Sequence, residues 1–270
     1  MNSVSLKKAI LDIIEKEPGK VTPVDLEKRM RRHFGIDKNR VRKILKALIV
    51  EGELMYTCHF GNSYLEKSFN RPVRVSDKVV LKPPNVSFEP GDGDVVIVLD
   101  HGASFGTGEH PTTRLAIRAI ESLTTRAALF SRQKDTLMLD IGTGSGVLAL
   151  TALRFGISRA LATDIDPCAK DEARKNARIN HLDHRFEIYE DDLETLKPPV
   201  DLVTANLRFP TLMNLSAVID RLCPPEGCAV FSGVREDEFQ KLSKAYAALG
   251  FMCLWKSFDL EWAGGAFVRY

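Results

Sequence analysis

Residues 139–147 read LDIGTGSGV, and this short stretch carries most of the information about the fold. It joins a predicted strand to a predicted helix, and ligands of open α/β sheets bind where such turns leave the strands. Its glycines at 142, 144 and 146 are spaced GxGxG, and Val147 stands where a dinucleotide-binding GxGxxG motif needs its last glycine. The loop therefore argues against a nicotinamide or flavin dinucleotide, while its glycines allow another ligand to approach the backbone.

Acidic residues lie at the ends of two predicted strands beside this loop. Asp140 directly precedes the turn, where its carboxylate suits a ligand with an ammonium group, either directly or through water. Asp164 ends the next strand, and a carboxylate there can accept hydrogen bonds from two neighbouring ribose hydroxyls. We expect Ile165 to pack on an adenine ring and Asp166 to cap the following helix. Together the loop and the acid at 164 indicate a ligand with an adenosyl group.

From about residue 112 onward, predicted helices and strands alternate. The strands are expected at 136–140, 159–164, 185–190, 201–205 and 229–233. The helices are expected at 112–123, 147–155, 168–180, 213–222 and 236–249. This alternation predicts a parallel sheet with helices on both faces. The segments 251–260 and 265–270 leave no room for a helix between them, so they predict a final antiparallel hairpin.

The first seventy residues follow a different pattern. Apolar residues recur at helical spacing in three segments: 4–17, 23–34 and 38–49. Thr22 and Asp37 are typical capping residues ahead of the second and third segments. Two short predicted strands, 53–58 and 63–67, then flank a Gly61-Asn62 turn. Three helices followed by a hairpin are similar to a winged helix.

Charge also separates this module from the rest. Residues 1–70 carry 14 Lys and Arg against 9 Asp and Glu, whereas residues 71–270 carry 24 against 27. The third predicted helix concentrates the positive charge on a face made of Lys38, Arg40, Arg42, Lys43 and Lys46. Contact with a nucleic-acid backbone, docking of a protein and simple solvation are the three interpretations that this face allows.

The amino-acid composition limits the classes of protein to which the chain can belong. The chain has 270 residues, of which 44% are hydrophobic and 27% charged, so we expect globular domains rather than disorder. No apolar run approaches the roughly 20 residues of a membrane-spanning helix, and the start lacks a signal core, which predicts a soluble cytoplasmic protein. The five cysteines form no CxxC pair, so neither a zinc site nor a disulfide framework is expected. We divide the chain into a winged-helix-like module at 1–69, connector strands and a cofactor-covering loop at 70–111, and a catalytic domain at 112–270. The connector strands are expected at 78–81 and 95–99.

The motifs resemble those of class I S-adenosylmethionine-dependent methyltransferases, on the stretch D-x-G-T-G-S-G and the strand ending in D-I-D-P. Three further segments resemble the ribosomal protein L11 methyltransferase family: Ser104–Thr113 (SFGTGEHPTT), Ala205-Asn206-Leu207 and Glu261-Trp262. The resemblance runs from Arg71 to Tyr270. It implies a Rossmann-like, mostly parallel sheet with an antiparallel final hairpin. It also implies methyl transfer from S-adenosyl-L-methionine to a lysine or N-terminal amine of a protein.

The resemblance also implies which residues form the site. The cofactor contacts fall on Thr113, Gly142, Asp164 and Asn206, and Gly144 and Gly146 complete the loop. Phe105, Gly106 and Thr107 are expected to close over the methionine part of the cofactor. Asp192 is the candidate for the adenine amino group, with the adjacent Asp191 as the alternative. Asn206 is the catalytic candidate, because its side-chain oxygen can orient the attacking nitrogen, and no metal is required.

Two departures from the family pattern bear on the substrate. Family members carry a different substrate-binding domain, so the basic module predicts a different protein substrate, such as a component of a nucleoprotein. Arg208, two residues after Asn206, is an unexpected charge that favours an acidic or phosphate-bearing partner.

Two questions stay open at this stage. His110 is either a general base or a residue that holds its loop by hydrogen bonds, and we favour the second role. The competing functions are an RNA or DNA methyltransferase and a nucleic-acid-binding regulator that senses S-adenosylmethionine. Against the first of these, the fourth strand lacks the Asn-Pro-Pro-aromatic motif that holds a flipped base.

Overall fold

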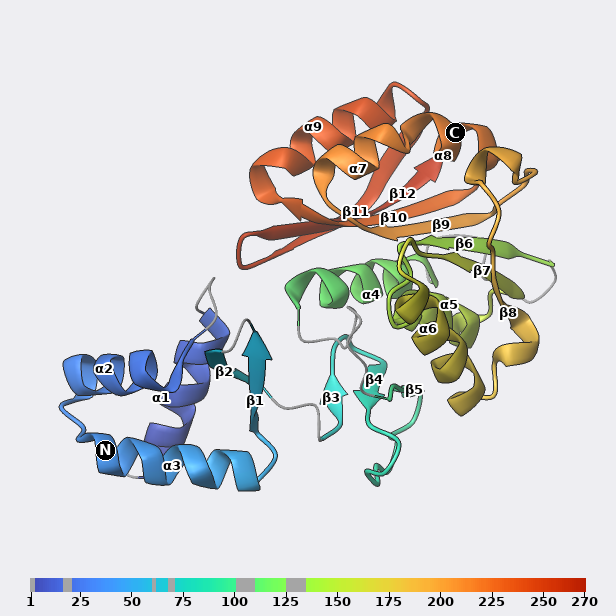
Figure 1. Cartoon of the computed structure of the whole chain (residues 1–270). Coiled ribbons are helices and arrows are strands. Elements are labelled where there is room, and N and C mark those ends of the chain that lie inside the picture. Colours follow the sequence, from blue (N-terminus) through green and yellow to red (C-terminus); the bar gives the residue numbers. More distant parts are fainter. Residues whose placement is uncertain (1–2, 17–20, 60–61, 68–70, 101–109, 125–134) are drawn as a thin grey trace. The chain divides into compact units, whose positions relative to one another are not determined.

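The computed structural model describes residues 3–16, 21–59, 62–67, 71–100, 110–124 and 135–270 (Figure 1). The chain forms two compact units, Met1–Pro72 and Val73–Tyr270. The strands expected in the connector belong to the second of these units. Within the described residues, no helix combines the length and the apolar character needed to cross a bilayer.

The first unit contains the three predicted helices and the predicted hairpin. They are α1 (Ser3–Lys16), α2 (Pro23–Phe34), α3 (Lys38–Val50), β1 (Leu54–His59) and β2 (Asn62–Lys67). The Thr22 and Asp37 side chains accept hydrogen bonds from backbone N–H groups of α2 and α3, which confirms both predicted caps. Val21 also bridges to Leu65 of the hairpin, and both side chains are buried in the unit's own core. Membership of the winged-helix class stays a prediction.

The second unit is built on a seven-stranded sheet in the order β11-β12-β10-β9-β6-β7-β8. Its strands are β6 (Leu137–Ile141), β7 (Arg159–Thr163), β8 (Phe186–Ile188), β9 (Leu202–Asn206), β10 (Cys228–Arg235), β11 (Phe251–Asp259) and β12 (Trp262–Arg269). The pairs from β8 to β10 are parallel, whereas β12 is antiparallel to both β10 and β11. The sheet confirms the predicted α/β fold class, a mostly parallel sheet that ends in an antiparallel hairpin.

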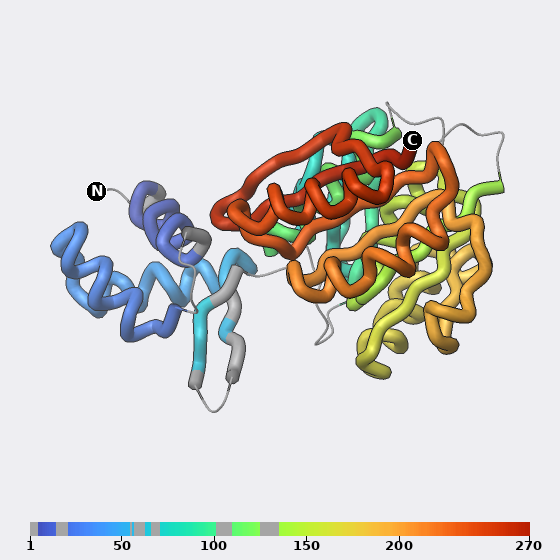
Figure 2. Tube along the Cα trace, turned by 90° about the horizontal axis from the view of Figure 1, so that it is seen from above, coloured from blue at the N-terminus to red at the C-terminus, as the bar shows by residue number. Residues whose placement is uncertain are grey.

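Helices cover both faces of this sheet (Figure 1). One face carries α4 (Pro111–Thr124), α5 (Val147–Phe155) and α6 (Pro167–Ile179). The other carries α7 (Phe209–Asn214), α8 (Ser216–Leu222) and α9 (Glu236–Ala247). In the view from above, α9 lies along the final hairpin (Figure 2). Two buried apolar layers therefore fix the sheet, and the strand ends are left to carry a site.

A small second sheet is formed by β3 (Val73–Arg74), β4 (Val79–Lys82) and β5 (Val95–Val98). It is anchored to α6 by two buried asparagines: the Asn180 side chain exchanges hydrogen bonds with the Val98 backbone, and the Asn176 Oδ1 accepts one from the Asp100 N–H. These contacts hold the end of β5 and the two residues after it against α6.

One predicted helix differs from the structure. The segment expected as a single helix at 213–222 forms α7 and α8, which are separated at Leu215. The first begins four residues earlier than predicted because Pro210 stands in its first turn, where its fixed φ angle favours a helix start. This earlier start places Thr211 and Leu215 beside the end of β9.

Candidate functional site

A cavity of about 680 Å³ opens at the carboxyl ends of β6, β7 and β9. Five of the predicted site residues line it: Gly142, Gly144, Asp164, Ile165 and Asn206. Leu193, Leu207 and Leu215 add an apolar wall beside Thr211, and of these four residues only Leu207 belonged to a sequence motif. The structure thus brings the glycine loop, the acid and the asparagine together, although 64 residues separate Gly142 from Asn206 along the chain.

The glycine loop takes a backbone path that other residues would strain. Gly142, Gly144 and Gly146 have φ angles of 72°, 53° and 83°, all in the left-handed region. A Cβ atom at Gly142 would lie 2.6 Å from the Leu207 Cδ2, and one at Gly146 would lie 3.2 Å from the Ala173 Cβ of α6. Both positions need glycine, since one touches the end of β9 and the other lets α6 pack against the loop.

Asp164 connects the loop to the start of α6. Its Oδ2 accepts a hydrogen bond from the Gly144 N–H at 2.9 Å, and its Oδ1 accepts one from the Asp166 N–H at 3.0 Å. A carboxylate has about four acceptor sites, so this side chain can accept further hydrogen bonds from a ligand. Ile165 beside it is fully exposed, which leaves an aliphatic surface for a flat ring to cover.

Asp166 caps a helix, and it is also one of the residues that line the cavity. Its Oδ1 accepts a hydrogen bond from the Cys168 N–H at 2.9 Å, so it is the N-cap of α6. The predicted capping role is confirmed, and it makes this acid a useful control for its neighbour at 164.

Two predicted contact residues carry buried polar atoms with no partner among the described residues. They are the Asn206 Oδ1 and the Thr113 Oγ1. The Ser232 hydroxyl donates a hydrogen bond to the Thr112 carbonyl at 2.8 Å, and Ser232 pairs in register with Asn206, so the start of α4 is tied to the strands beside β9. A buried polar atom left unpaired costs about 1–3 kcal/mol. Asn206 lines the cavity, so its Oδ1 indicates a ligand that completes the hydrogen bond, whereas Thr113 is not among the residues that line the cavity.

Asp140 lies beneath the loop. Its side chain is fully buried and does not line the cavity, so the expected contact with a ligand, directly or through water, stays a prediction. Its two oxygens accept hydrogen bonds from the hydroxyls of Thr143, at 2.7 Å, and Thr204, at 2.6 Å. Because Thr204 belongs to β9, Asp140 ties the loop to the neighbouring strand and acts as a positioning residue.

The burial of Asp140 has a measurable consequence for stability. Loss of solvation raises its pKa to about 6, against the hydroxyl hydrogen bonds that lower it. Asp140 has its ordinary, lower pKa in the unfolded chain, so as the pH rises it ionises in the unfolded chain before it ionises in the folded protein. Its contribution to stability is therefore full below about pH 4 and is lost by about pH 6. We expect the free energy of unfolding to fall by about 3 kcal/mol more across this window in the natural protein than in Asp140→Asn. Urea unfolding at pH 4, 5 and 6.5 measures this, and parallel profiles of the two proteins would contradict it.

The candidates for the adenine amino group remain a pair. Asp191 and Asp192 are both exposed, and neither lines the cavity, although Leu193 directly after them does. Asp192 caps a single turn by accepting a hydrogen bond from the Glu194 N–H at 3.0 Å. Phe105, Gly106 and Thr107, expected to cover the cofactor, lie outside the described residues.

His110 holds the first turn of α4. Its Nδ1 lies 2.8 Å from the Thr112 hydroxyl and accepts a hydrogen bond from the Thr112 N–H at 3.3 Å. Burial lowers its pKa, as do the nearby cations of Arg114 and Arg208. The Nδ1 atom is already used in capping, and a lowered pKa makes the ring a weaker base, so the loop-holding role is favoured over that of a general base.

Gly233 is a site residue that the sequence analysis missed. Its φ angle is 85°, and a Cβ atom there would lie 2.5 Å from the Leu207 carbonyl oxygen and 2.9 Å from the Leu207 nitrogen. Because the obstacle is backbone, this glycine lets the chain after Asn206 pass close to β10. Its only signal in the sequence is a glycine at the end of the strand expected at 229–233.

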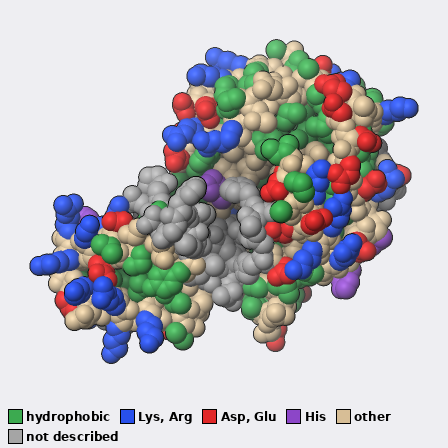
Figure 3. Space-filling model, in the orientation of Figure 1, with side chains coloured by type: hydrophobic (Ala, Val, Ile, Leu, Met, Phe, Trp, Pro, Cys, Tyr) green, Lys and Arg blue, Asp and Glu red, His purple; other side chains and the backbone are tan. Residues whose placement is uncertain are grey.

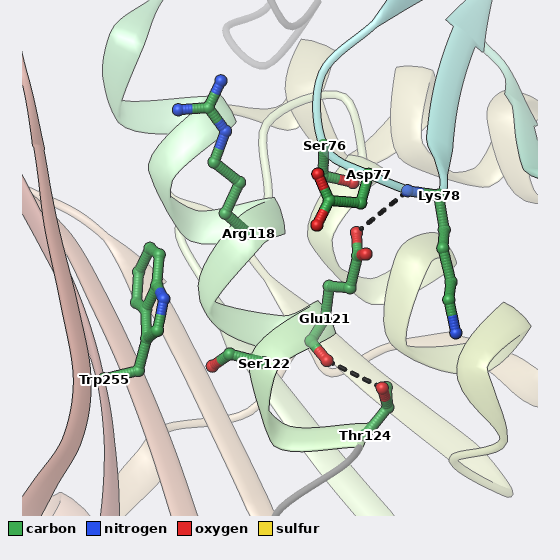
Figure 4. Close-up of a pocket in the computed structure, with 8 residues that line it drawn as sticks. All are labelled: Ser76, Asp77, Lys78, Arg118, Glu121, Ser122, Thr124 and Trp255. Atoms are coloured by element: carbon green, nitrogen blue, oxygen red, sulfur yellow. Dashed lines mark hydrogen bonds between the residues drawn. The ribbon is translucent and has the colours of Figure 1, made fainter.

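A second cavity of about 350 Å³ lies between α4, the turn before β4, and β11 (Figure 4). Several of its polar groups bond one another or nearby backbone. The Lys78 N–H donates to Glu121 Oε2 at 3.4 Å, the Thr124 hydroxyl to the Glu121 carbonyl at 2.7 Å, and the Arg118 Nε to the Val75 carbonyl at 3.0 Å. None of its lining atoms is among the unpartnered buried atoms of the described chain. The strand-end cavity is therefore the better candidate.

Most of the chain is similar to known proteins. The family model described as ribosomal protein L11 methyltransferase (PrmA) matches residues 63–268. The ribosomal protein L11 methyltransferase of Clostridium perfringens (strain ATCC 13124) is 31% identical over 213 residues, which are 79% of this chain and 65% of the relative. That of Gloeobacter violaceus is 36% identical over 193 residues, which are 72% of this chain and 58% of the relative.

A solved structure agrees over the same region. The crystal structure of the ribosomal protein L11 methylase from Lactobacillus delbrueckii subsp. bulgaricus superposes with a TM-score of 0.64 at 28% identity. The match covers 74% of this chain and 98% of that chain. This chain spans less than two thirds of the length of the first curated relatives it matches, and the family match begins only at residue 63, in β2.

Proposed function

Because this chain belongs to the ribosomal protein L11 methyltransferase family, we propose that it methylates an amine of a protein, on a lysine side chain or at an N-terminus. The observation that carries this proposal is the buried, unpartnered Asn206 Oδ1 at the end of β9, beside the glycine loop and Asp164. An acceptor oxygen at this place suits an amine that must be held toward a methyl donor. We place the activity in the cytoplasm, where ribosomal proteins are made.

S-adenosyl-L-methionine is the cofactor of this family, and the described residues fit it. The glycine loop presents backbone rather than side chains to the cavity, which lets a nucleoside approach closely. Asp164 has acceptor capacity for ribose hydroxyls, and the exposed Ile165 offers a surface for adenine. Thr113 Oγ1 is a further buried group that needs a partner.

The protein's share of the chemistry is alignment. The cofactor, when bound, supplies an electrophilic methyl group. The Asn206 Oδ1 accepts a hydrogen bond from the substrate nitrogen and so fixes the direction of its lone pair. Correct orientation of two reactants can by itself contribute several kcal/mol to catalysis. Asp140, Gly142 and Gly233 contribute indirectly, because they set the position of the loop and of the chain around Asn206.

The N-terminal unit bears on the choice of substrate. The family match leaves α1, α2 and α3 outside, so these helices have no counterpart in the matched region. Ribosomal protein L11 is the first acceptor to test because relatives carry its name. We propose that the acceptor is a ribosomal protein or another protein bound to nucleic acid, and that this unit contacts the nucleic acid.

The charge of the N-terminal unit supports such a contact. Helix α3 carries five basic residues and no acidic one, and the five predicted contact residues, Lys38, Arg40, Arg42, Lys43 and Lys46, are all exposed. Arg42 pairs with Glu27 of α2, whereas Lys38, Lys43 and Lys46 form no ion pair with another described residue. Lys and Arg side chains are conspicuous on this unit in Figure 3. A face of this kind can neutralise phosphates.

Binding to nucleic acid should depend steeply on salt. We expect the full chain to bind a 20-base-pair duplex, and the triple variant Lys38→Ala, Lys43→Ala, Lys46→Ala to bind at least tenfold more weakly at 100 mM KCl. Each lost phosphate contact should reduce the slope of log K against log salt by about 0.9. Fluorescence anisotropy with DNA and RNA duplexes at 50–200 mM KCl measures both. The control replaces Lys197, Lys241 and Lys244, exposed lysines of the other unit. Equal losses in both triple variants would refute a specific contact surface.

The methyl acceptor can be identified directly. The full chain is incubated with radiolabelled S-adenosylmethionine and either ribosomal particles or purified ribosomal protein L11, and the product is divided between protease and nuclease. Label released by protease and stable to nuclease is expected. Label lost to nuclease would make the protein a nucleic-acid methyltransferase, and binding of the cofactor without any label would favour a sensor.

A further inference from the structure

Arg208 lies two residues after Asn206 and is the N-cap residue of α7. It follows the end of β9 and is exposed, with its guanidinium carbon 5.1 Å from the centre of the Trp262 ring. The Trp262 ring in turn meets the His110 ring edge to face, with centres 5.1 Å apart. Trp262 begins β12, and His110 holds the start of α4. The guanidinium of Arg208 thus lies over the Trp262 ring of β12, and the His110 ring at the start of α4 contacts Trp262 in turn.

Two acids next to Trp262, Asp259 across the hairpin and Glu261 before it in the chain, are paired with other arginines. Asp259, which pairs with Trp262 across the final hairpin, accepts two hydrogen bonds from Arg114, at 3.1 and 2.9 Å. Glu261 pairs with Arg235 at 3.0 Å. Arg208 has no carboxylate partner among the described residues. Its stacking on Trp262 leaves the edge of the guanidinium, with its N–H groups, available to an incoming anion.

We propose that Arg208, supported by Trp262, is a specificity-determining residue that binds a carboxylate close to the amine being methylated. The inference rests on the proposed protein-amine activity and names its substrate class: a lysine or N-terminal amine with a neighbouring Asp or Glu. A guanidinium presents a rigid fork of donors that matches a carboxylate in two hydrogen bonds, whereas a lysine in its place would offer a point charge. The site would reject a substrate with a basic neighbour, because two cations would then face each other.

The test compares peptides that differ only beside the acceptor. Twelve-residue peptides with one central lysine carry Glu, Gln, Lys or phosphoserine at the adjacent position, and methyl transfer is followed with radiolabelled cofactor. For the natural protein we expect kcat/KM to be at least tenfold higher with Glu than with Gln, mainly through KM, and lowest with Lys. Arg208→Ala should bring the Glu and Gln peptides to within twofold of each other, mainly by raising KM for the Glu peptide. Arg208→Lys should retain part of the preference.

A matched control and a binding measurement keep the outcomes separate. Arg178→Ala removes an exposed arginine of α6 and should keep the full preference for Glu. Affinity for S-adenosylhomocysteine, measured by calorimetry, should stay within twofold in all variants, which shows that they fold. Equal rates on the Glu and Gln peptides, or a strong preference for phosphoserine over Glu, would overturn the carboxylate assignment alone. Absence of transfer to every peptide and to ribosomal proteins would overturn the proposed function and this inference with it.

Discussion

Replacing Asn206 with alanine should lower turnover by about 100-fold or more while S-adenosylhomocysteine binds within tenfold of its natural affinity. The buried Oδ1 has no partner among the described residues, so its proposed partner is the substrate nitrogen. Without it, the amine still enters the cavity but its lone pair is no longer aimed, and misplacement of reactants by about 1 Å can cost about 100-fold. Single-turnover methyl transfer and calorimetry separate the two effects.

The matched control is Asn214→Ala, at an exposed asparagine that ends α7. It should leave both turnover and binding unchanged. The Asn206→Asp variant keeps an acceptor oxygen and should retain more activity than Asn206→Ala. An Asn206→Ala protein that turns over at close to the natural rate would refute the alignment role, and one that loses cofactor binding altogether would reassign Asn206 to the cofactor alone.

The second large effect is expected at Asp164. Asp164→Ala removes the proposed ribose contacts and leaves the Gly144 and Asp166 N–H groups without their acceptor. Hydrogen bonds to a charged group are worth about 1.5–3 kcal/mol each, so the loss of two predicts a decrease in S-adenosylhomocysteine affinity of at least about 100-fold. Calorimetric titration measures this affinity. Asp164→Asn keeps the size and shape of the side chain, and its affinity should lie between those of the natural protein and Asp164→Ala.

Asp166→Ala serves as the control two residues away. It removes the N-cap of α6 and should lower the free energy of unfolding by about 1 kcal/mol, with affinity within threefold of the natural protein. Similar affinity losses in Asp164→Ala and Asp166→Ala would mean that both act by deforming α6. A natural affinity in Asp164→Ala would contradict the ribose contact itself.

The parts of the fold that the sequence predicted well are those set by local chemistry. The alternation of strands and helices and the caps at Thr22, Asp37 and Asp166 each depend on residues within a few positions of one another. The break at Leu215 was missed because apolar periodicity continues through it, and what interrupts the helix is the packing of two short segments beside β9.

The features of the site divide in the same way, into those that local sequence predicts and those that depend on the fold. By itself, the sequence determined which residues end the strands, since the GxGxG loop, Asp164 and Asn206 follow from strand periodicity and motif. Only the tertiary structure decided what those residues touch. In the structure, the Asp140 carboxylate accepts a hydrogen bond from Thr204, and Gly233 lies against the Leu207 backbone. The Arg208 guanidinium lies over the Trp262 ring. The physical reason is that strand order and register bring together groups 26 to 64 residues apart, and no local pattern records which oxygen, ring or backbone atom will be the neighbour.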